Sequence, residues 1–334
     1  AIGGALHGRQ RPDAGWPVVL HGHGTTGDRF SHLEGGGQVP ALLAASRDFL
    51  SFCIPQPFHG DRWPDGSTTS RELYSFNIFN PEAGRSTFRQ AALDTVAAVR
   101  FIRENLGPGG PISEAHPELL VDLDRIYYLG HSQGGITGAL ALAFTPDVKA
   151  WALSGAGGGL TMTLLQREDP LVIRDILTSA LGAGEETVFH EEHPAIGLIQ
   201  TLAEATDPIN FGPLWIRESE GPPTSVLLTE GMRDQDTPPD TSEALATAAG
   251  LPIARPYRER AVFGLELRGM DPERSPYSGN VIHADGTQVT AGLGQFDGSH
   301  FVIFNNFAAG ALWSNFLYSQ VRDGAPGEIG GDYP

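Results

Sequence analysis

Lysine, cysteine and long apolar runs are nearly or wholly absent from this sequence. Lys149 is the only lysine and Cys53 the only cysteine among the 334 residues. A lone cysteine cannot form a disulfide within the chain, and it says little about the redox compartment. No apolar run approaches about 18 residues, so the sequence predicts no integral membrane segment.

Positive charge is also scarce, because 22 Lys and Arg stand against 40 Asp and Glu, a net charge of −18 with histidine neutral. Such a surface repels nucleic-acid phosphates and anionic lipid head groups, so we expect no nucleic-acid partner. The hydrophobic content of 40% is too high for a disordered chain. With 43 Gly and 25 Pro, the composition indicates a loop-rich globular protein.

Short β-branched or aromatic segments alternate with longer segments of helical periodicity, which predicts an α/β fold with a mostly parallel sheet. The predicted strands are residues 16–20, 49–54, 125–129, 148–153, 224–229 and 260–267. The predicted helices are residues 39–46, 88–106, 136–144, 241–249 and, for the most part, 301–320. Residues 272–298 are expected to form a loop.

Residues 160–222 differ from their surroundings because their pattern is helical and amphipathic. Two apolar stripes occur there at helical spacing: Leu171, Ile173, Ile176, Leu177 and Leu181, then Ile196, Ile199 and Leu202. The segment lies between two predicted strands. We therefore expect a helical lid over the C-terminal edge of the sheet, with residues 1–159 and 223–334 forming the core.

Residues 130–134 match the pattern G-x-S-x-G, with a predicted strand before them and a predicted helix after them. In a nucleophile elbow of this kind, a sharp turn holds the serine in a strained conformation. The residues two positions away must lack bulk, and Gly130 and Gly134 meet this need. Ser132 is therefore the candidate nucleophile, the alternative being an ordinary tight turn.

A serine nucleophile needs a base that takes its proton and an acid that orients the base. When the serine occupies such an elbow, the acid follows it along the chain and the histidine comes last. Glu230, Asp234 and Asp236 lie just beyond the predicted strand 224–229. We favour Asp234, with Asp236 as the alternative and Glu230 as a weaker third; a turn or capping role is the other explanation.

The histidines that follow the elbow are His190, His193, His283 and His300. His190 and His193 precede every candidate acid, which breaks the expected order, and we interpret them as polar surface rather than as a metal pair. His283 lies in a polar loop. His300 lies in a turn that leads into apolar residues 302–304, so it is the candidate base, a structural histidine being the alternative.

Catalysis by these groups also needs two backbone N–H groups aimed at the developing oxyanion. Gln133, which follows the nucleophile, supplies one of them. The other is expected from the glycine-rich loop 21–24, where we assign it to His23, with Gly24 next to it. The imidazoles of His21 and His23 are interpreted as packing or pocket-lining groups.

Taken together, these segments resemble the α/β-hydrolase superfamily, in its bacterial lipase and esterase branch. Residues 18–24 resemble the oxyanion strand and loop, and residues 130–134 resemble the elbow. Residues 231–238 resemble the family's G-x-x-D-x-x-x-P acid loop, which favours Asp234, and residues 298–301 resemble the histidine loop. The resemblance spans most of the chain and implies an α/β-hydrolase fold.

A narrower likeness involves residues 57–62, residues 85–90 with Asp94, and residues 207–210. These segments are similar to the catalytic domain of virulence-factor-type lipases of bacteria. Such lipases are typically exported, so this likeness implies an extracellular or periplasmic protein. No signal-peptide pattern is visible in the sequence.

The sequence thus predicts a serine carboxylic-ester hydrolase that acts through an acyl-enzyme, with no metal and no organic cofactor. The expected substrates are acyl or aromatic esters, either small molecules or lipid- or polyester-type compounds, because an apolar lid disfavours charged groups. An amidase or peptidase would use the same residues. A non-catalytic binding protein on the same fold is the third possibility.

Overall fold

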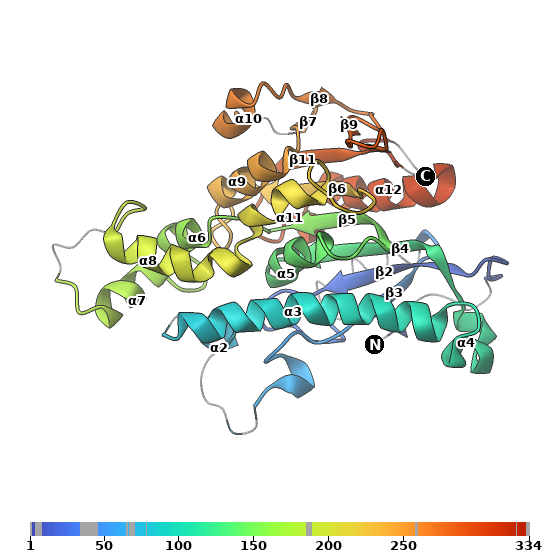
Figure 1. The fold of residues 1–334 in the computed structure, drawn as a ribbon, viewed down its shortest axis with the longest axis horizontal. Coiled ribbons are helices and arrows are strands. Elements are labelled where there is room, and N and C mark those ends of the chain that lie inside the picture. Colours follow the sequence, from blue (N-terminus) through green and yellow to red (C-terminus); the bar gives the residue numbers. More distant parts are fainter. Residues whose placement is uncertain are drawn as a thin grey trace.

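The computed structural model describes residues 2–3, 9–33, 46–64, 66, 71–77, 79–184, 189–257, 260–324 and 326–331. A seven-stranded sheet forms its centre, in the order β1-β3-β2-β4-β5-β6-β11 (Figure 1). Its strands are β1 (Ile2–Gly3), β2 (Trp16–Gly22), β3 (Leu50–Cys53), β4 (Val121–His131), β5 (Val148–Ser154), β6 (Ser225–Gly231) and β11 (Ala291–Phe296). Neighbours from β3 to β11 run parallel, whereas β1 is antiparallel to β3.

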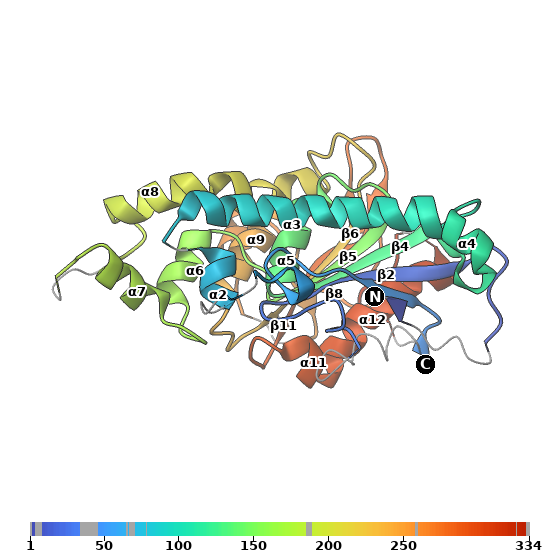
Figure 2. The same ribbon diagram turned by 90° about the horizontal axis from the view of Figure 1, so that it is seen from below.

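Both faces of the sheet are covered by helices, as the alternation of side chains along each strand requires. Val18 and Leu20 of β2 belong to a core cluster with α3 (Pro81–Phe101), α5 (Gln133–Leu142) and α9 (Pro239–Ala249). Val19, between them, packs in a second cluster with α12 (Phe307–Asp323). Figure 2 shows α3 and α12 on opposite sides of the strands. The predicted mostly parallel sheet flanked by helices is therefore confirmed.

Most predicted elements have the expected type, with shifted ends. The helix expected at 88–106 begins earlier, because Pro81 occupies its first turn and the Asn80 side chain accepts a hydrogen bond from the Ala83 N–H. It continues through a π turn at Ile102–Leu106 and is followed by α4 (Pro111–Ala115). The helix predicted at 39–46 lies outside the described residues, apart from Ser46.

Two predictions near the C-terminus are wrong. Residues 260–267 are not a strand: residues 260–262 have no regular structure, and α10 (Phe263–Leu267) follows them. The last strand of the sheet is instead β11, inside the region 272–298 that was expected to be a loop. Its Gly292 and Gly294 conceal the strand signal, and both are needed for packing. A Cβ on Gly292 would lie 2.2 Å from the Tyr277 hydroxyl, and one on Gly294 would lie 2.8 Å from Leu312.

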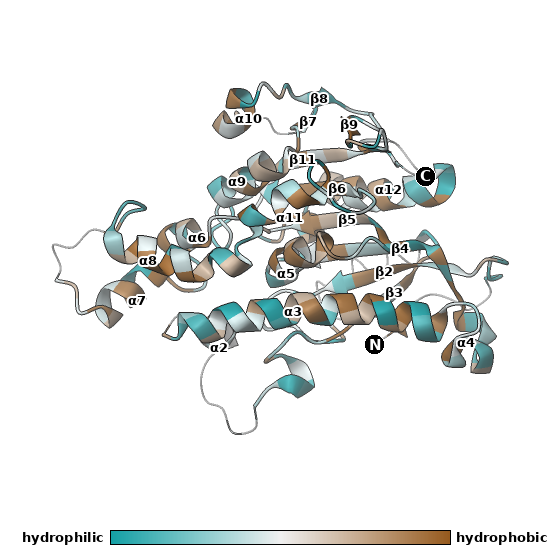
Figure 3. Cartoon of the chain, viewed as in Figure 1, coloured by the Kyte–Doolittle hydropathy of each residue, from teal (hydrophilic) through white to brown (hydrophobic). Residues whose placement is uncertain are grey.

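Helices of the segment 160–222, hereafter the helical insertion, extend beyond the carboxyl ends of the strands (Figure 1). They are α6 (Leu160–Gln166), α7 (Ile173–Ala180) and α8 (Pro194–Ala203), followed by short 3-10 turns. Trp215, near the end of the insertion, is buried in the core cluster and bonds the Ala139 carbonyl of α5. Figure 3 shows hydrophobic stretches on α7 and α8 as well as on the central strands.

The remaining elements are small and lie outside the sheet. They are α2 (Arg71–Phe76), α11 (Val302–Asn305), the parallel pair β7 (Ala254–Arg255) and β8 (Glu273–Arg274), and the hairpin β9 (Val281–Ile282) with β10 (Gln288–Val289). Among the described residues, no helix combines the length and the apolar character that a membrane crossing needs.

Candidate active site

Ser132 occupies a sharp turn between β4 and α5. Its backbone has φ 55° and ψ −124°, a strained conformation for a residue with a side chain, and its N–H donates to the Ser154 carbonyl at 2.8 Å. A Cβ on Gly134 would lie 2.1 Å from the Gly22 carbonyl oxygen, and one on Gly130 would lie 2.5 Å from the Gly134 oxygen. The turn therefore requires glycine at both positions, as the sequence pattern predicts.

His300 and Asp234 form a buried hydrogen-bonded pair. Nδ1 of His300 lies 2.8 Å from Oδ2 of Asp234, and both side chains are almost completely inaccessible to solvent. The other carboxylate oxygen, Oδ1, accepts the N–H groups of Asp236 and Thr237 at 2.9 and 2.8 Å. These bonds fix the carboxylate, so it orients the imidazole with Nδ1 protonated and Nε2 available as a base.

The loops that carry this pair are joined by their backbones. The Met232 N–H donates to the Phe296 carbonyl and the Arg233 N–H to the Gly298 carbonyl, both at 2.8 Å. A Cβ on Gly231 would lie 2.2 Å from the Ser299 oxygen, so the two loops meet without room for a side chain. Because β6 and β11 are neighbouring parallel strands, their carboxyl ends deliver the acid and the histidine to one edge of the sheet.

The His300 ring lies beside the turn that carries Ser132. It is 4.7 Å from the ring of His131, and a Cβ on Gly155 would lie 2.7 Å from its Cε1 atom. His131 immediately precedes the serine, and Gly155 follows the residue whose carbonyl accepts the serine N–H. The structure thus brings Ser132, Asp234 and His300 to the same edge of the sheet.

The loop after β2 passes directly over Ser132, because a Cβ on Gly24 would lie 3.1 Å from the Ser132 Cβ. Both nitrogens of the His23 ring are engaged: Nδ1 lies 2.8 Å from the Gly24 carbonyl, and Nε2 accepts the Gln56 N–H at 3.0 Å. The Thr25 hydroxyl donates to the Gln133 side chain at 3.0 Å. These bonds fix the loop that carries the predicted donor His23 against the helix that begins at Gln133.

The architecture is matched by solved structures. Acetyl xylan esterase 1 from Thermoanaerobacterium sp. JW/SL YS485 is similar with a TM-score of 0.53 at 16% identity, over 92% of this chain and 76% of that one. The acetyl xylan esterase from Paenibacillus sp. R4 gives a TM-score of 0.51 at 16% identity, over 88% and 71%. The chain has the α/β-hydrolase fold. No protein-family model matches the sequence, and no curated protein sequence matches it.

The other histidines and acids that the sequence suggested make different contacts in this α/β-hydrolase fold. His283 bonds the Asp285 carboxylate at 2.8 Å and the Ser219 carbonyl at 3.1 Å, away from Asp234. The His193 side chain accepts the Ala195 N–H at the start of α8, a capping role. Glu230 is buried within β6 and bonds the Gln295 amide at 2.8 Å, so it contacts the neighbouring strand.

A group of buried histidines lies near the turn that carries Ser132. Burial, with the charges of His300 and His21 adding to it, lowers the pKa of His131 well below its usual value. Burial also lowers the pKa of His21 to about 3, with His32 and His23 contributing. These side chains are therefore neutral at pH 7, and His131 serves as an uncharged packing surface against His300.

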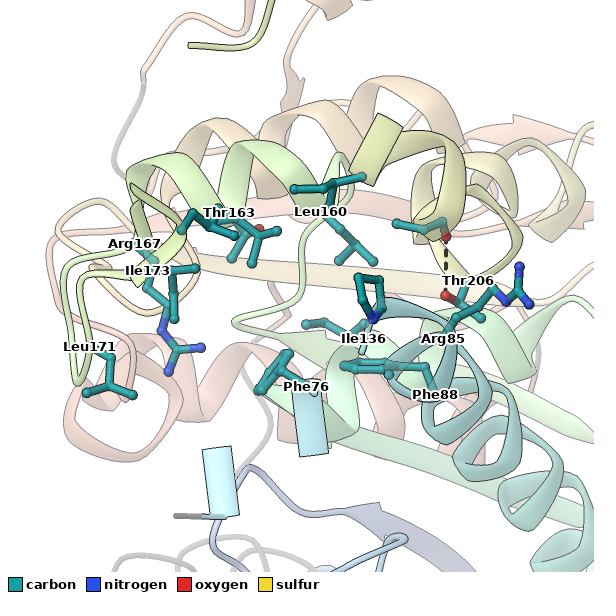
Figure 4. A pocket seen from close by; sticks show the side chains of 16 residues that line it. Phe76, Arg85, Phe88, Ile136, Leu160, Thr163, Arg167, Leu171, Ile173 and Thr206 are labelled. Carbon is teal, nitrogen blue, oxygen red and sulfur yellow. Dashed lines mark hydrogen bonds between the residues drawn. The ribbon is translucent and has the colours of Figure 1, made fainter. Parts of the chain in front are cut away.

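An apolar cavity of about 100 Å³ opens between the α/β-hydrolase core and the helical insertion. Figure 4 shows Phe76, Phe88 and Ile136 of the core on one side, with Leu160 and Thr163 of the insertion opposite. Ile136 lies one helical turn after Ser132, whose carbonyl accepts its N–H at 3.0 Å. The sequence identifies the apolar stripe of the insertion, but it gives no signal that Phe76 and Phe88 complete the pocket.

Proposed function

We propose that this protein is a serine hydrolase that cleaves carboxylic esters, with Ser132 as nucleophile, His300 as base and Asp234 as the orienting acid. The observation that carries the proposal is the buried 2.8 Å bond between His300 and Asp234 at the edge of the sheet where Ser132 occupies its strained turn. The fold, which is shared with two acetyl xylan esterases, is consistent with this chemistry.

In the proposed reaction, the Ser132 oxygen attacks the ester carbonyl while its proton passes to Nε2 of His300. The imidazolium that forms is stabilised by the ionised Asp234. The backbone N–H groups of Gln133 and His23 stabilise the oxyanion, and His300 then protonates the departing alcohol. Water next gives its proton to His300 and attacks the acyl-enzyme, which releases the acid and restores the serine hydroxyl.

The cavity supports an acyl or aromatic ester as the substrate, because most of its lining side chains are apolar, with Arg85 and Arg167 as the charged exceptions. We propose that the helical insertion forms a lid over this cavity. The narrower likeness to exported bacterial lipases leads us to propose a lipid- or polyester-type ester as a substrate class. A preference for strongly anionic esters would contradict the proposed pocket.

The first test is covalent labelling with a fluorophosphonate probe, which reacts with activated serines. We expect the protein to be labelled and Ser132→Ala to be unlabelled, because only an activated hydroxyl attacks the probe. Ser299→Ala is the matched control: this exposed serine precedes His300, and its replacement should leave labelling intact. An unlabelled wild-type protein would favour a non-catalytic binding role.

The second test compares p-nitrophenyl esters with matched anilides, since the same residues serve both reactions. We expect ester cleavage to dominate at every acyl length. Faster cleavage of the anilides would assign the protein to amide or peptide hydrolysis instead. Hydrolysis rates for esters of increasing acyl length, measured with and without a lipid–water interface, then show which acyl length the pocket prefers.

A further inference from the structure

A second carboxylate lies beside the His300–Asp234 pair. Oxygen atoms of Asp234 and Asp236 and a ring nitrogen of His300 all lie within 4.8 Å of one another. Asp236 is partly buried, with a side-chain exposure of 20%. At such a distance an ionised carboxylate acts on the charge of the imidazole without being bonded to it.

We propose that Asp236 is a second positioning carboxylate for His300, which stabilises the imidazolium together with Asp234 and partly replaces Asp234 when that residue is lost. The proposal rests on the proposed function, in which His300 becomes positively charged during each turnover. Asp236 is a positioning residue and not a catalytic residue, because it acts on the reaction only through His300.

The turn that positions Asp234 also positions Asp236. The Asp236 N–H donates to Oδ1 of Asp234, so the backbone bond that fixes the first carboxylate also places the second one beside it. Burial raises the pKa of the Asp236 carboxyl, and the nearby His300 and Arg167 oppose this rise. The other charged groups that face it are Asp234 of its own loop and Asp169 of the helical insertion.

The three donor groups do not form an open metal site. Oδ2 of Asp234 bonds His300, and its Oδ1 accepts two backbone N–H groups, so both oxygens already have partners. An Arg167 nitrogen lies 3.8 Å from Oδ1 of Asp236, and a cation bound there would be repelled by it. The arrangement fits two carboxylates that act on one imidazolium.

Arg167 links Asp236 to the pocket. The Arg167 side chain is 9% exposed, its guanidinium lies over the Phe76 ring at 5.5 Å, and it lines the apolar cavity. The N–H groups of Glu168 and Asp169 donate to the Gln235 carbonyl at 3.0 and 3.3 Å, which joins the insertion to the acid loop. Arg167 therefore reduces the attraction between Asp236 and the imidazolium, so its removal should act opposite to removal of Asp236.

The main variant is Asp236→Asn, with Asp297→Asn as the matched control. Asp297 is an exposed residue three positions before His300 whose carboxylate pairs with Arg233, so its removal makes the same change in net charge. We expect Asp236→Asn to lower kcat about 10-fold at nearly unchanged KM and to move the acid limb of the pH–rate profile down by about 1 pH unit. Asp297→Asn should change kcat less than about twofold.

Variants that lack the Asp234 carboxylate test whether Asp236 partly replaces it. Loss of the orienting acid costs serine hydrolases about 10⁴-fold in kcat. We expect Asp234→Asn to lose only about 10²-fold here, and Asp234→Asn with Asp236→Asn to reach the full loss. Asp236→Asn would then lower kcat by a larger factor in the Asp234→Asn protein than in the wild type. Arg167→Gln should move the acid limb to higher pH.

A measurement independent of activity separates this inference from the proposed function. NMR titration of histidine-labelled protein, with the His300 signal assigned through His300→Gln, should show its midpoint about 1 pH unit lower in Asp236→Asn and unchanged in Asp297→Asn. If the wild type hydrolyses esters but both variants titrate alike, the role of Asp236 is refuted and the proposed function stands. If the wild type is inactive but the midpoint moves in Asp236→Asn alone, the proposed function fails and the interaction with His300 stands.

Discussion

The turn at Ser132 and the helical insertion are held in place in different ways. Around the turn, backbone atoms are so close that a Cβ on Gly134 would overlap the Gly22 carbonyl at 2.1 Å. In the insertion, Gly184 and Gly197 have no atom within 4 Å of a Cβ built on them. Steric contact fixes the turn at Ser132, whereas the insertion has room for larger side chains at Gly184 and Gly197.

A small number of polar contacts also holds the insertion, in addition to the apolar packing of Trp215 in the core cluster. The buried Asp207 carboxylate accepts N–H groups from Gly159 and Leu160 at 2.8 and 2.7 Å, and the Gln200 amide at 2.8 Å. Through Asp207, these bonds join the start of α6 to α8. The turn that carries Ser132 is thus fixed by close backbone contacts of the core, whereas the insertion relies on contacts of individual side chains.

Gly134→Ala should have the largest effect. The added methyl group would overlap backbone atoms of β2 that cannot move without disturbing the sheet, so we expect a loss of more than about 4 kcal/mol in stability, together with the activity. Thermal unfolding and fluorophosphonate labelling measure both. A folded, labelled Gly134→Ala protein would contradict the steric account of the turn.

Asp207→Ala tests the polar attachment of the insertion. Buried N–H groups of Gly159 and Leu160 would lose their acceptor, so we expect the free energy of unfolding to fall by about 3 kcal/mol in chemical denaturation. KM for long-chain esters should rise while labelling of Ser132 persists. The exposed Asp175→Asn of α7 is the control and should change neither quantity.

Glu230→Gln tests a buried carboxyl of the core, which accepts a hydrogen bond from the Gln295 amide. Burial and Glu243 raise its pKa from 4.5 to about 8, so the folded state holds a proton that the unfolded state releases above pH 4.5. The wild type should therefore lose stability as the pH rises from 4.5 towards 8.

The isosteric amide cannot release a proton, so Glu230→Gln should remove this loss. Between pH 5 and pH 7, we expect the variant to gain on the order of 2 kcal/mol relative to the wild type in urea unfolding. The exposed Glu266→Gln should show no such dependence. A constant difference between wild type and Glu230→Gln across this range would show that Glu230 is not held protonated.

Leu164→Trp tests whether the cavity receives the acyl group. Leu164 lines the cavity from α6, and the larger ring would fill much of it. We expect kcat/KM for an octanoate ester to fall about 10-fold, equivalent to about 1.4 kcal/mol, and that for an acetate ester to change less than twofold. An equal fall for both esters would place acyl binding elsewhere.

Gly197→Ala should have the smallest effect and the opposite sign. The position lies within α8 with open space around it, so alanine should stabilise the helix by about 0.5–1 kcal/mol. Thermal unfolding would show a slightly higher midpoint with activity unchanged. A destabilised Gly197→Ala protein would mean that the insertion is packed as tightly as the turn at Ser132.

The fold was predictable where local patterns were strong. The buried strands around residues 16–20, 125–129 and 148–153 and the helix after Ser132 follow from apolar runs and turn residues. The last strand was missed because glycines that make room for Tyr277 and Leu312 weaken its pattern. Its predicted replacement at 260–267 has strand-like alternation, but there a short helix leaves Phe263 and Leu267 exposed.

Local sequence patterns define the residue types, their order and the glycines that a serine turn requires, because these depend on local backbone geometry. They also place Asp234 just after one apolar segment and His300 just before another. Long-range packing establishes that β6 and β11 are neighbours, that Asp236 and Arg167 meet beside His300, and that Phe76 and Phe88 complete a pocket. Such contacts join residues far apart in the chain, and packing rather than local preference selects them.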